Sequence, residues 1–260
     1  MKQHNWLKLA GIIVLAGLAS LAQAHKTWGH YTSLSKEQVE NFHALAVTGN
    51  IEVDFLQSPT LKIHGSGPQK VLDVATAQVK DGVLHIGFLP GKEMPAQLRV
   101  VVTGPELTHV TLAGNAEAHV RGRIQTPELV LQLSQNSEFA ADGLTADKLS
   151  IHAADNSEAD LNRLDVKHVH VSASGKADVE LAGLALKAEL ENTGAGEIDA
   201  SDLRVQTGLA TVRGKGDVEI SAYEALTAMA LGKGKIKYRG APVNFQQQGN
   251  VKHIVADKED

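Results

Sequence analysis

The chain has 260 residues, with 25 basic against 30 acidic side chains and no cysteine. Its 43% hydrophobic content is enough to build a buried core, which excludes a disordered chain or a collagen-like fibre. The absence of cysteine excludes disulfides, thiolate metal sites and a lipid-modified N-terminal cysteine. The acidic balance argues against nucleic acid as a partner, because phosphate binding needs clustered lysine and arginine.

Residues 1–24 have the order of a cleavable secretory signal. Lys2 and Lys8 precede an apolar stretch around Ala10–Ala22, and the segment closes with Ala22-Gln23-Ala24. This order predicts cleavage before His25. A retained membrane anchor is the alternative, but the apolar stretch is shorter than the roughly 20 residues that span a bilayer. We therefore expect an exported protein, in the periplasm or at the cell surface, with no integral membrane segment after cleavage.

The N-terminal third of the remaining chain is irregular. Residues 25–41 are polar, and Val47–Val53 resembles one isolated turn of the repeat described below. The predicted strands of this region are Leu61–Gly65, Val71–Lys80, Val83–Phe88 and Gln97–Thr103. Asp81-Gly82 predicts a tight hairpin between two of them.

From residue 107 onward the chain repeats itself about every 20 residues. Each unit has one charged anchor residue, and the anchors are Glu117, Glu138, Glu158, Asp178, Glu197, Asp217 and Lys235. The residue before each anchor is always alanine, serine or glycine, and the positions one and three after it are mostly apolar. Alternation with a period of two indicates half-buried strands rather than helices.

Each unit also contains a second alternating run, separated from the first by a corner. The second runs include Leu129/Leu131/Leu133, Leu149/Ile151, Val169/Val171 and Leu226/Ala228. The predicted apolar corner residues are Leu144, Leu164, Leu184, Leu203 and Tyr223, and Gly143 and Gly183 precede two of them, where a tight bend would tolerate positive φ. Two strands and two bends per unit predict an all-β, single-domain β-solenoid. An antiparallel β-sandwich is the alternative.

The C-terminal region predicts the end of this solenoid. Val243–Val255 offers one or two closing strands, and Asn244, Gln246–Gln248 and Asn250 suit a polar cap. We expect one domain over residues 42–256, with its first third capping the solenoid as an N-terminal β elaboration, and a charged tail at 257–260.

The sequence resembles the GIN domain family, which is named for auto-transporter adhesin heads, from about Phe42 to Val251. The likeness rests on Phe42-x-x-Leu-x-Val-x-Gly-x-Ile-x-Val53, Asp81-Gly-Val-Leu-His-Ile86, the Gly-x-Gly-x-Ile/Val units at Gly194, Gly214 and Gly232, and Tyr238-x-Gly-x-Pro242. The resemblance implies an exported bacterial protein with a right-handed β-solenoid and a role in adhesion. It transfers no catalytic residue.

Two outward columns of carboxylates are the main candidate site. We call them the acidic ladder, and its members are Glu117, Glu138, Glu158, Asp160, Asp178, Glu180, Glu197, Asp199, Asp217 and Glu219. Lys235 and Lys237 end the two columns. The ladder predicts an electrostatic surface for divalent cations or a basic partner. A solvated face whose charge prevents aggregation is the alternative.

Histidine is the other abundant polar residue, with 12 in the chain. His168 and His170 share a predicted strand, and strand geometry puts His152 about 8 Å from His170, too far for one zinc ion. We interpret them as surface residues and predict neither a metal site nor a cofactor. His25 and His30 offer only a weak copper or zinc site near the new N-terminus.

No enzyme signature is present. The chain lacks Gly-x-Ser-x-Gly, His-Glu-x-x-His and phosphate-loop motifs. We therefore expect a non-enzymatic interaction or adhesion module for an envelope or extracellular protein or glycan. The alternatives are a structural envelope protein without a ligand and a carbohydrate-active β-helix enzyme, whose activity would depend on Asp178 and Glu197.

Overall fold

The computed structural model describes Ile13–Val14, Tyr31–Ser33 and residues 40–92 and 96–257. The predicted signal peptide lies outside these residues except for Ile13–Val14, and so do its cleavage site, His25 and His30. In the described part of the chain, no helix is both long and apolar enough to cross a bilayer.

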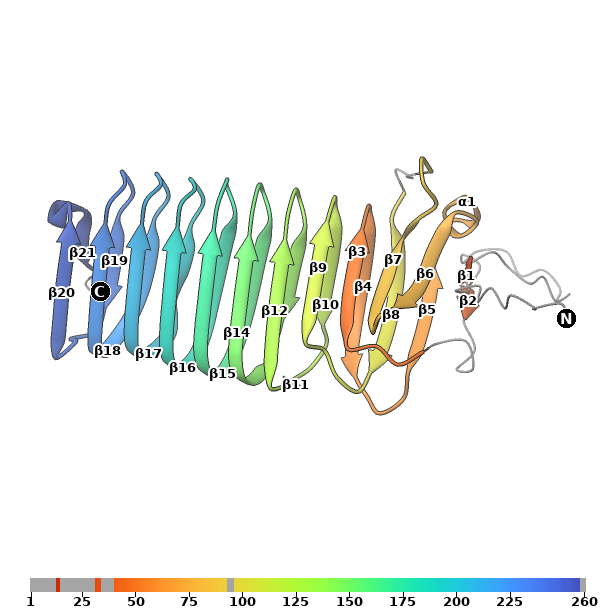
Figure 1. Cartoon of the computed structure of the whole chain (residues 1–260), viewed down its shortest axis with the longest axis horizontal. Helices are drawn as coiled ribbons and strands as arrows, with labels where there is room; N and C mark the ends of the chain where they lie inside the picture. The colour runs from red at the N-terminus through yellow and green to blue at the C-terminus, as the bar shows by residue number, and fades with distance from the viewer. Residues whose placement is uncertain (1–12, 15–30, 34–39, 93–95, 258–260) are drawn as a thin grey trace, which may run out of the picture.

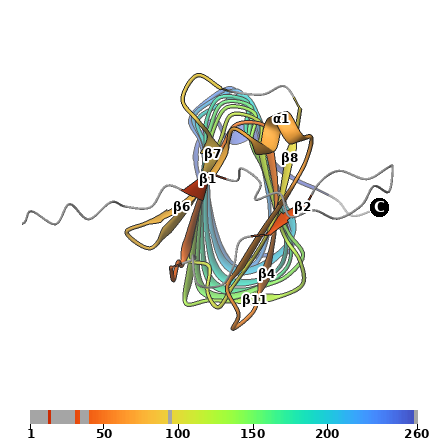
Figure 2. The same ribbon diagram turned by 90° about the vertical axis from the view of Figure 1, so that its right-hand side faces the viewer.

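The chain from residue 109 onward winds into a β-solenoid of parallel strands, as the repeat predicts (Figure 1). Its strands are β9 (His109–Ala113), β10 (Ala116–Val120), β11 (Ile124–Gln125), β12 (Glu128–Leu133), β13 (Glu138–Ala141), β14 (Leu144–Ala153), β15 (Glu158–Ala173), β16 (Asp178–Asn192), β17 (Ile198–Val212), β18 (Val218–Ala230), β19 (Ile236–Arg239), β20 (Asn244–Gly249) and β21 (Ile254–Ala256). A short 3₁₀ helix, η2 (Val251–His253), joins the last two. Viewed along the solenoid, successive coils superimpose as a flattened ring with two long sides (Figure 2).

Each long side is a parallel sheet with one strand from every coil. The acidic sheet contains β10, β13, the first residues of β15 to β18, then β19 and β21. The second sheet contains β9, β12, the last residues of β14 to β18, then β20. The anchors therefore stack in the predicted order: Glu117 pairs with Glu138, Glu138 with Glu158, and Glu158 with Asp178.

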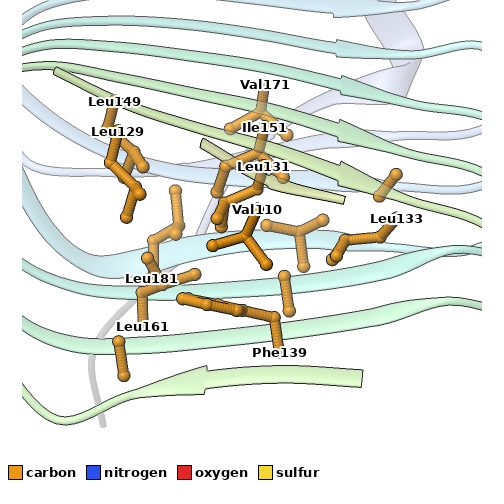
Figure 3. Packing of buried hydrophobic residues seen from close by; sticks show 14 of the residues in the cluster. Val110, Leu129, Leu131, Leu133, Phe139, Leu149, Ile151, Leu161, Val171 and Leu181 are labelled. Carbon is orange, nitrogen blue, oxygen red and sulfur yellow. The ribbon is translucent and has the colours of Figure 1, made fainter. Parts of the chain in front are cut away.

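Columns of apolar side chains fill the space between the sheets (Figure 3). Val110, Leu131, Ile151 and Val171 follow one another in register, and each is at most 1% exposed. Phe139 reaches into the same core from the acidic sheet. Full burial of one such side chain stabilises the fold by about 1.5–3 kcal/mol. A single coil offers too few of these contacts to fold alone, so the coils stabilise one another.

The small residue before each anchor lies where successive backbones approach closely. Ala116, Ser137, Ser157 and Ala177 are at most 1% exposed. A Cβ atom on Gly216 would overlap the carbonyl oxygen of Gly196 in the preceding coil. Larger side chains are excluded because they would force neighbouring coils apart.

The corner prediction is correct for three residues and wrong for two. Leu144, Leu164 and Leu203 are buried, whereas Leu184 is 56% exposed and Tyr223 is 40% exposed. The bends differ in length, so that Gly183 and not Leu184 is the register partner of Leu164 and Leu203. A shift of one residue turns a side chain from the core to solvent. At Tyr223, an extra residue in the bend has the same effect, because Val205 and Thr207 pair with Ala222 and Ala225.

The two corner glycines also differ. Gly183 adopts a φ of 134° as predicted, and a Cβ atom there would overlap the backbone of Leu164. Gly143 does not use the tolerance for positive φ that the sequence suggests, since it is not among the described residues with positive φ. Its lack of a side chain instead makes room for Arg123, whose Cβ lies 3.3 Å from the position that a Cβ of Gly143 would take.

The N-terminal third forms one further coil and a cap. Its elements are β1 (Ile13–Val14), β2 (Tyr31–Ser33), β3 (Ala44–Thr48), β4 (Ile51–Gln57), β5 (Lys62–Ser66), α1 (Gln69–Leu72), β6 (Ala75–Lys80), β7 (Val83–Phe88) and β8 (Leu98–Gly104). β3 and β4 make the coil predicted at Val47–Val53, which stacks on β9 and β10. β7 and β8 stack on its other side, so this coil lies between later parts of the chain (Figure 1). β5 and β6 then pair antiparallel with β8 and β7 and turn away from the repeat.

The predicted strand over Val71–Lys80 is wrong in its first part. Pro68 precedes the short helix α1, and strand β6 begins only at Ala75. Val71 and Leu72 are adjacent and both at most 1% exposed, which a helical turn permits and an alternating strand does not. The hairpin prediction is confirmed, because Asp81 and Gly82 have φ values of 52° and 77°, as a tight turn of this type requires.

Candidate functional site

The structure brings all ten residues of the acidic ladder onto the outer face of the acidic sheet. The anchor column runs from Glu117 to Asp217, and the second column runs Asp160, Glu180, Asp199 and Glu219 in register. The alternate residues Val179 and Leu181 point inward and are at most 3% exposed. Because strand residues alternate between faces, the carboxylates on either side of Val179 must point outward.

The ladder continues one coil farther toward the N-terminal end than the sequence predicted. Glu52 pairs with Glu117, and Asp54 pairs with His119 in the second column. His119 and Ala140 interrupt that column before it resumes at Asp160. The signal for Glu52 was present in the sequence, since Gly49-x-Ile-Glu-Val53 matches the later coils.

Basic residues neutralise both ends of the extended acidic ladder. At the N-terminal end, Arg99 lies 2.9 Å from Glu52 and Arg121 lies 2.5 Å from Asp54. At the C-terminal end, the ammonium group of Lys237 lies 2.5 Å from the Glu219 carboxylate. This hydrogen bond raises the pKa of Lys237 above its usual value. Within the part of the chain that the structure describes, the ladder carboxylates of the middle coils therefore form no salt bridge.

Two glutamates of the ladder have perturbed acidity. Partial burial raises the pKa of Glu158, and the neighbouring Glu138, Glu180, Asp178 and Asp160 raise it further. Partial burial is also the main cause that raises the pKa of Glu197. The charge of Glu219 raises this pKa further, and the charge of Lys237 lowers it. Repulsion among like charges therefore adds to burial in disfavouring the ionised form of these two glutamates.

The aspartates of the ladder also hold the backbone. Asp178 accepts a hydrogen bond of 2.8 Å from the backbone N–H of Glu197 in the next coil, and Asp217 accepts one of 2.7 Å from Lys235. Asp199 accepts a hydrogen bond of 2.9 Å from the backbone of Ser201. The glutamates, with longer side chains, are the members best placed to meet a ligand.

The predicted histidine group lies on the second sheet. The rings of His152 and His170 are 6.0 Å apart between centroids and meet edge to face. They line a shallow hollow of about 370 Å³ together with His168 and Glu189. A hydrogen bond from Lys187 is the main cause that lowers the pKa of Glu189. Over the described ranges, no three histidine or carboxylate groups are arranged to hold a metal ion.

A groove along the corner side of the solenoid was not predicted. It encloses about 1100 Å³ and contains the exposed Leu184, Leu186 and Tyr223. The guanidinium carbon of Arg204 lies 5.1 Å from the centre of the Tyr223 ring. The sequence did not reveal this groove because Leu184 and Tyr223 were placed at the same corner position as the buried Leu144, Leu164 and Leu203.

Several solved bacterial proteins have this fold. A "putative adhesin" from Parabacteroides merdae is 23% identical, with a TM-score of 0.80 over 88% of this chain and 96% of that chain. Another "putative adhesin", from Parabacteroides distasonis, is 24% identical, with a TM-score of 0.80 over 88% of this chain and 98% of that one. A "putative lipid binding protein" from Parabacteroides distasonis is 15% identical, with a TM-score of 0.77 over 88% and 96%.

The sequence comparison gives the family. No curated protein matches this chain. A family model described as "Putative auto-transporter adhesin, head GIN domain" matches residues 41–242, which include the ladder coils and most of the N-terminal cap. The match confirms the resemblance seen in the motifs of the sequence. The chain therefore belongs to the GIN domain family.

Proposed function

We propose that this protein is an exported, non-enzymatic interaction module that binds a basic partner through the acidic ladder. The predicted signal peptide at residues 1–24 supports export, and the GIN family and its adhesin-named structural neighbours support a surface role. The observation that carries the proposal is the alignment of the ladder carboxylates over successive coils, whose salt bridges among the described residues lie at the two ends.

The geometry favours an extended partner with repeated positive charge. Equivalent side chains of stacked strands recur about every 4.8 Å along the solenoid, so a basic peptide segment lying along its axis can meet several carboxylates in turn. Beside burial, four neighbouring carboxylates and no cation act on the pKa of Glu158, whereas Lys237 opposes the shift at Glu197. Cations placed there relieve repulsion inside the ladder, and this adds to the direct attraction.

Binding of an oligolysine peptide to the exported chain tests this proposal. We expect measurable affinity by fluorescence anisotropy at low salt, falling steeply as salt screens the charges. Replacing Glu138, Glu158 and Glu180 together with glutamine should weaken binding about tenfold, because each exposed charge contact contributes roughly 0.2–1 kcal/mol. A matched triple variant on the second sheet, at Glu128, Glu189 and Glu191, removes the same charge and should change binding little.

Three outcomes would contradict the proposal. Absence of binding at low salt favours a structural protein without a ligand. Equal losses in the two triple variants indicate attraction to net charge rather than to the ladder. Displacement of the peptide by millimolar calcium, with heat in a calcium titration, favours the alternative that the ladder binds divalent cations.

The export part of the proposal has its own test. Fractionation of cells into cytoplasm, periplasm, outer membrane and medium should find the chain outside the cytoplasm, with its N-terminus at His25 by mass spectrometry. Retention in the cytoplasm would remove export without affecting the peptide-binding result.

A further inference from the structure

We infer that the C-terminal end of the solenoid is a docking surface for a second copy of this chain, joined end to end through β20. The two ends of the solenoid differ. At the N-terminal end, β5 and β6 pair antiparallel with β8 and β7 and so cover their edges. Among the described residues, β20 pairs only with β18, and β21 only with β19. Both terminal strands thus present one open edge.

An open strand edge is a template for pairing with another strand, and proteins usually block it with charge, proline or a bulge. β20 has the sequence Asn-Phe-Gln-Gln-Gln-Gly and contains no charged residue and no proline. Its register with β18 is continuous over all six residues, without a bulge. Half of its backbone groups point toward β18, and the others point away from the solenoid.

Exposed apolar side chains are also concentrated at this end. Val243 is 83% exposed and Val251 is 52% exposed, and the two flank β20, whereas Val255 pairs with Lys237 and lies on the outer face of the acidic sheet. In the same coil, Phe245 packs on Tyr238 with 4.7 Å between ring centroids and remains only half-buried. The apolar core therefore continues to the end surface, where a second core can meet it.

The side chains of β20 complement themselves under a two-fold axis. The register with buried Leu226, Ala228 and Ala230 makes Phe245, Gln247 and Gly249 the inward positions. Antiparallel pairing must place inward residues opposite inward residues, so one symmetric register puts Gln247 opposite Gln247 of the second copy. Phe245 then faces Gly249 of the second copy.

The same two-fold arrangement satisfies the polar side chains. On the outer face, Gln246 of one copy lies opposite Gln248 of the other, so side-chain amides can pair with amides. The strand places no like charges opposite each other. An aromatic ring over a glycine is a favourable cross-strand pair. Because the identical strand provides every complementary group, a second copy is the occupant that the edge fits best.

Sedimentation of the purified exported chain over a wide concentration range tests this inference. We expect a concentration-dependent doubling of the molar mass. Gln247→Lys places like charges opposite each other at the two-fold axis and should weaken the association about tenfold, with an unchanged circular dichroism spectrum. Gln132→Lys, the same change at an exposed position of the interior strand β12, should leave the association unchanged.

A charge-swap experiment identifies the occupant. Mixing Gln247→Lys with Gln247→Glu should restore the doubled mass, because the opposite charges then face each other. A mass that stays at one chain at every concentration would overturn the inference. So would a dimer that persists unchanged in Gln247→Lys, or one that Gln132→Lys disrupts equally.

Discussion

Replacing Glu158 with glutamine should stabilise the protein at neutral pH. The carboxylate of Glu158 stacks between those of Glu138 and Asp178, its register partners in the adjacent coils. At about 5 Å in water each of these pairs repels by roughly 0.8 kcal/mol. Physiological salt, with a screening length of about 8 Å, reduces each to nearly half. Removing one charge from two such pairs therefore gives a gain of about 1 kcal/mol.

The pH dependence of this gain follows from the raised pKa of Glu158. The Glu158 carboxylate binds its proton more tightly in the folded state than in the unfolded state, where its pKa is near 4.5. The ionised carboxylate thus destabilises the fold above the folded-state pKa, and this effect disappears as the pH falls below 4.5. The advantage of Glu158→Gln should be full at pH 7 and absent in acid.

Glu189 provides a control of opposite sign. Lys187 lowers its pKa, so its carboxylate contributes stability above pH 4.5 that is lost as the pH falls through the lower folded-state value. Glu189→Gln should cost up to about 1 kcal/mol at pH 7. Urea midpoints of both variants and the parent chain, at pH 7 and in acid, check these signs. If Glu158→Gln is less stable than the parent at pH 7, repulsion between the ladder carboxylates is not the main effect of Glu158 on stability, and the prediction is refuted.

Three further changes test the packing of the coils, each by thermal or urea unfolding. Ala177→Leu should cost roughly 1–3 kcal/mol, because the buried site between coils has no room for a larger side chain; an unchanged midpoint would contradict the close approach. Asn192→Ala should cost about 1–3 kcal/mol, since the fully buried amide donates to the carbonyls of Gly196 and Asp217. Gly183→Ala should cost more than about 1 kcal/mol because of its positive φ and the adjacent Leu164 backbone; a neutral result would show that the bend relaxes.

The buried amide of Asn192 marks a change in the turns that precede the anchors. Gln135, Asp155 and Gly175 have positive φ in the earlier turns, whereas Gly194 and Gly214 do not. Asn192 accepts a hydrogen bond from the N–H of Gly194 and donates to two carbonyls in this region. In the earlier turns a serine hydroxyl accepts from the backbone, as Ser157 does from the N–H of Ala154, and in the turn at Gly194 the amide of Asn192 takes this role. Sequence reasoning saw the change in glycine content but did not assign this role to Asn192.

The local repeat was sufficient to predict the coil, the order of its strands and the ladder from Glu117 to Glu219. Stacked coils bring residue i beside a residue about 20 positions later, so a pattern read along the chain is also a pattern of contacts. This is why the anchors, the small column and the buried runs at Leu131 and Ile151 were recoverable without coordinates.

Only the tertiary structure decided the features that depend on bend length and on distant segments. A difference of one residue in a bend turned Leu184 outward, and an extra residue exposed Tyr223, which together opened the corner groove. Arg121 neutralises Asp54 across 67 positions of sequence, because the coil of β3 and β4 lies between later strands. The repeat carries no information about such insertions. Their position is fixed by which edges of the growing stack remain open, and that is settled by packing of the whole chain.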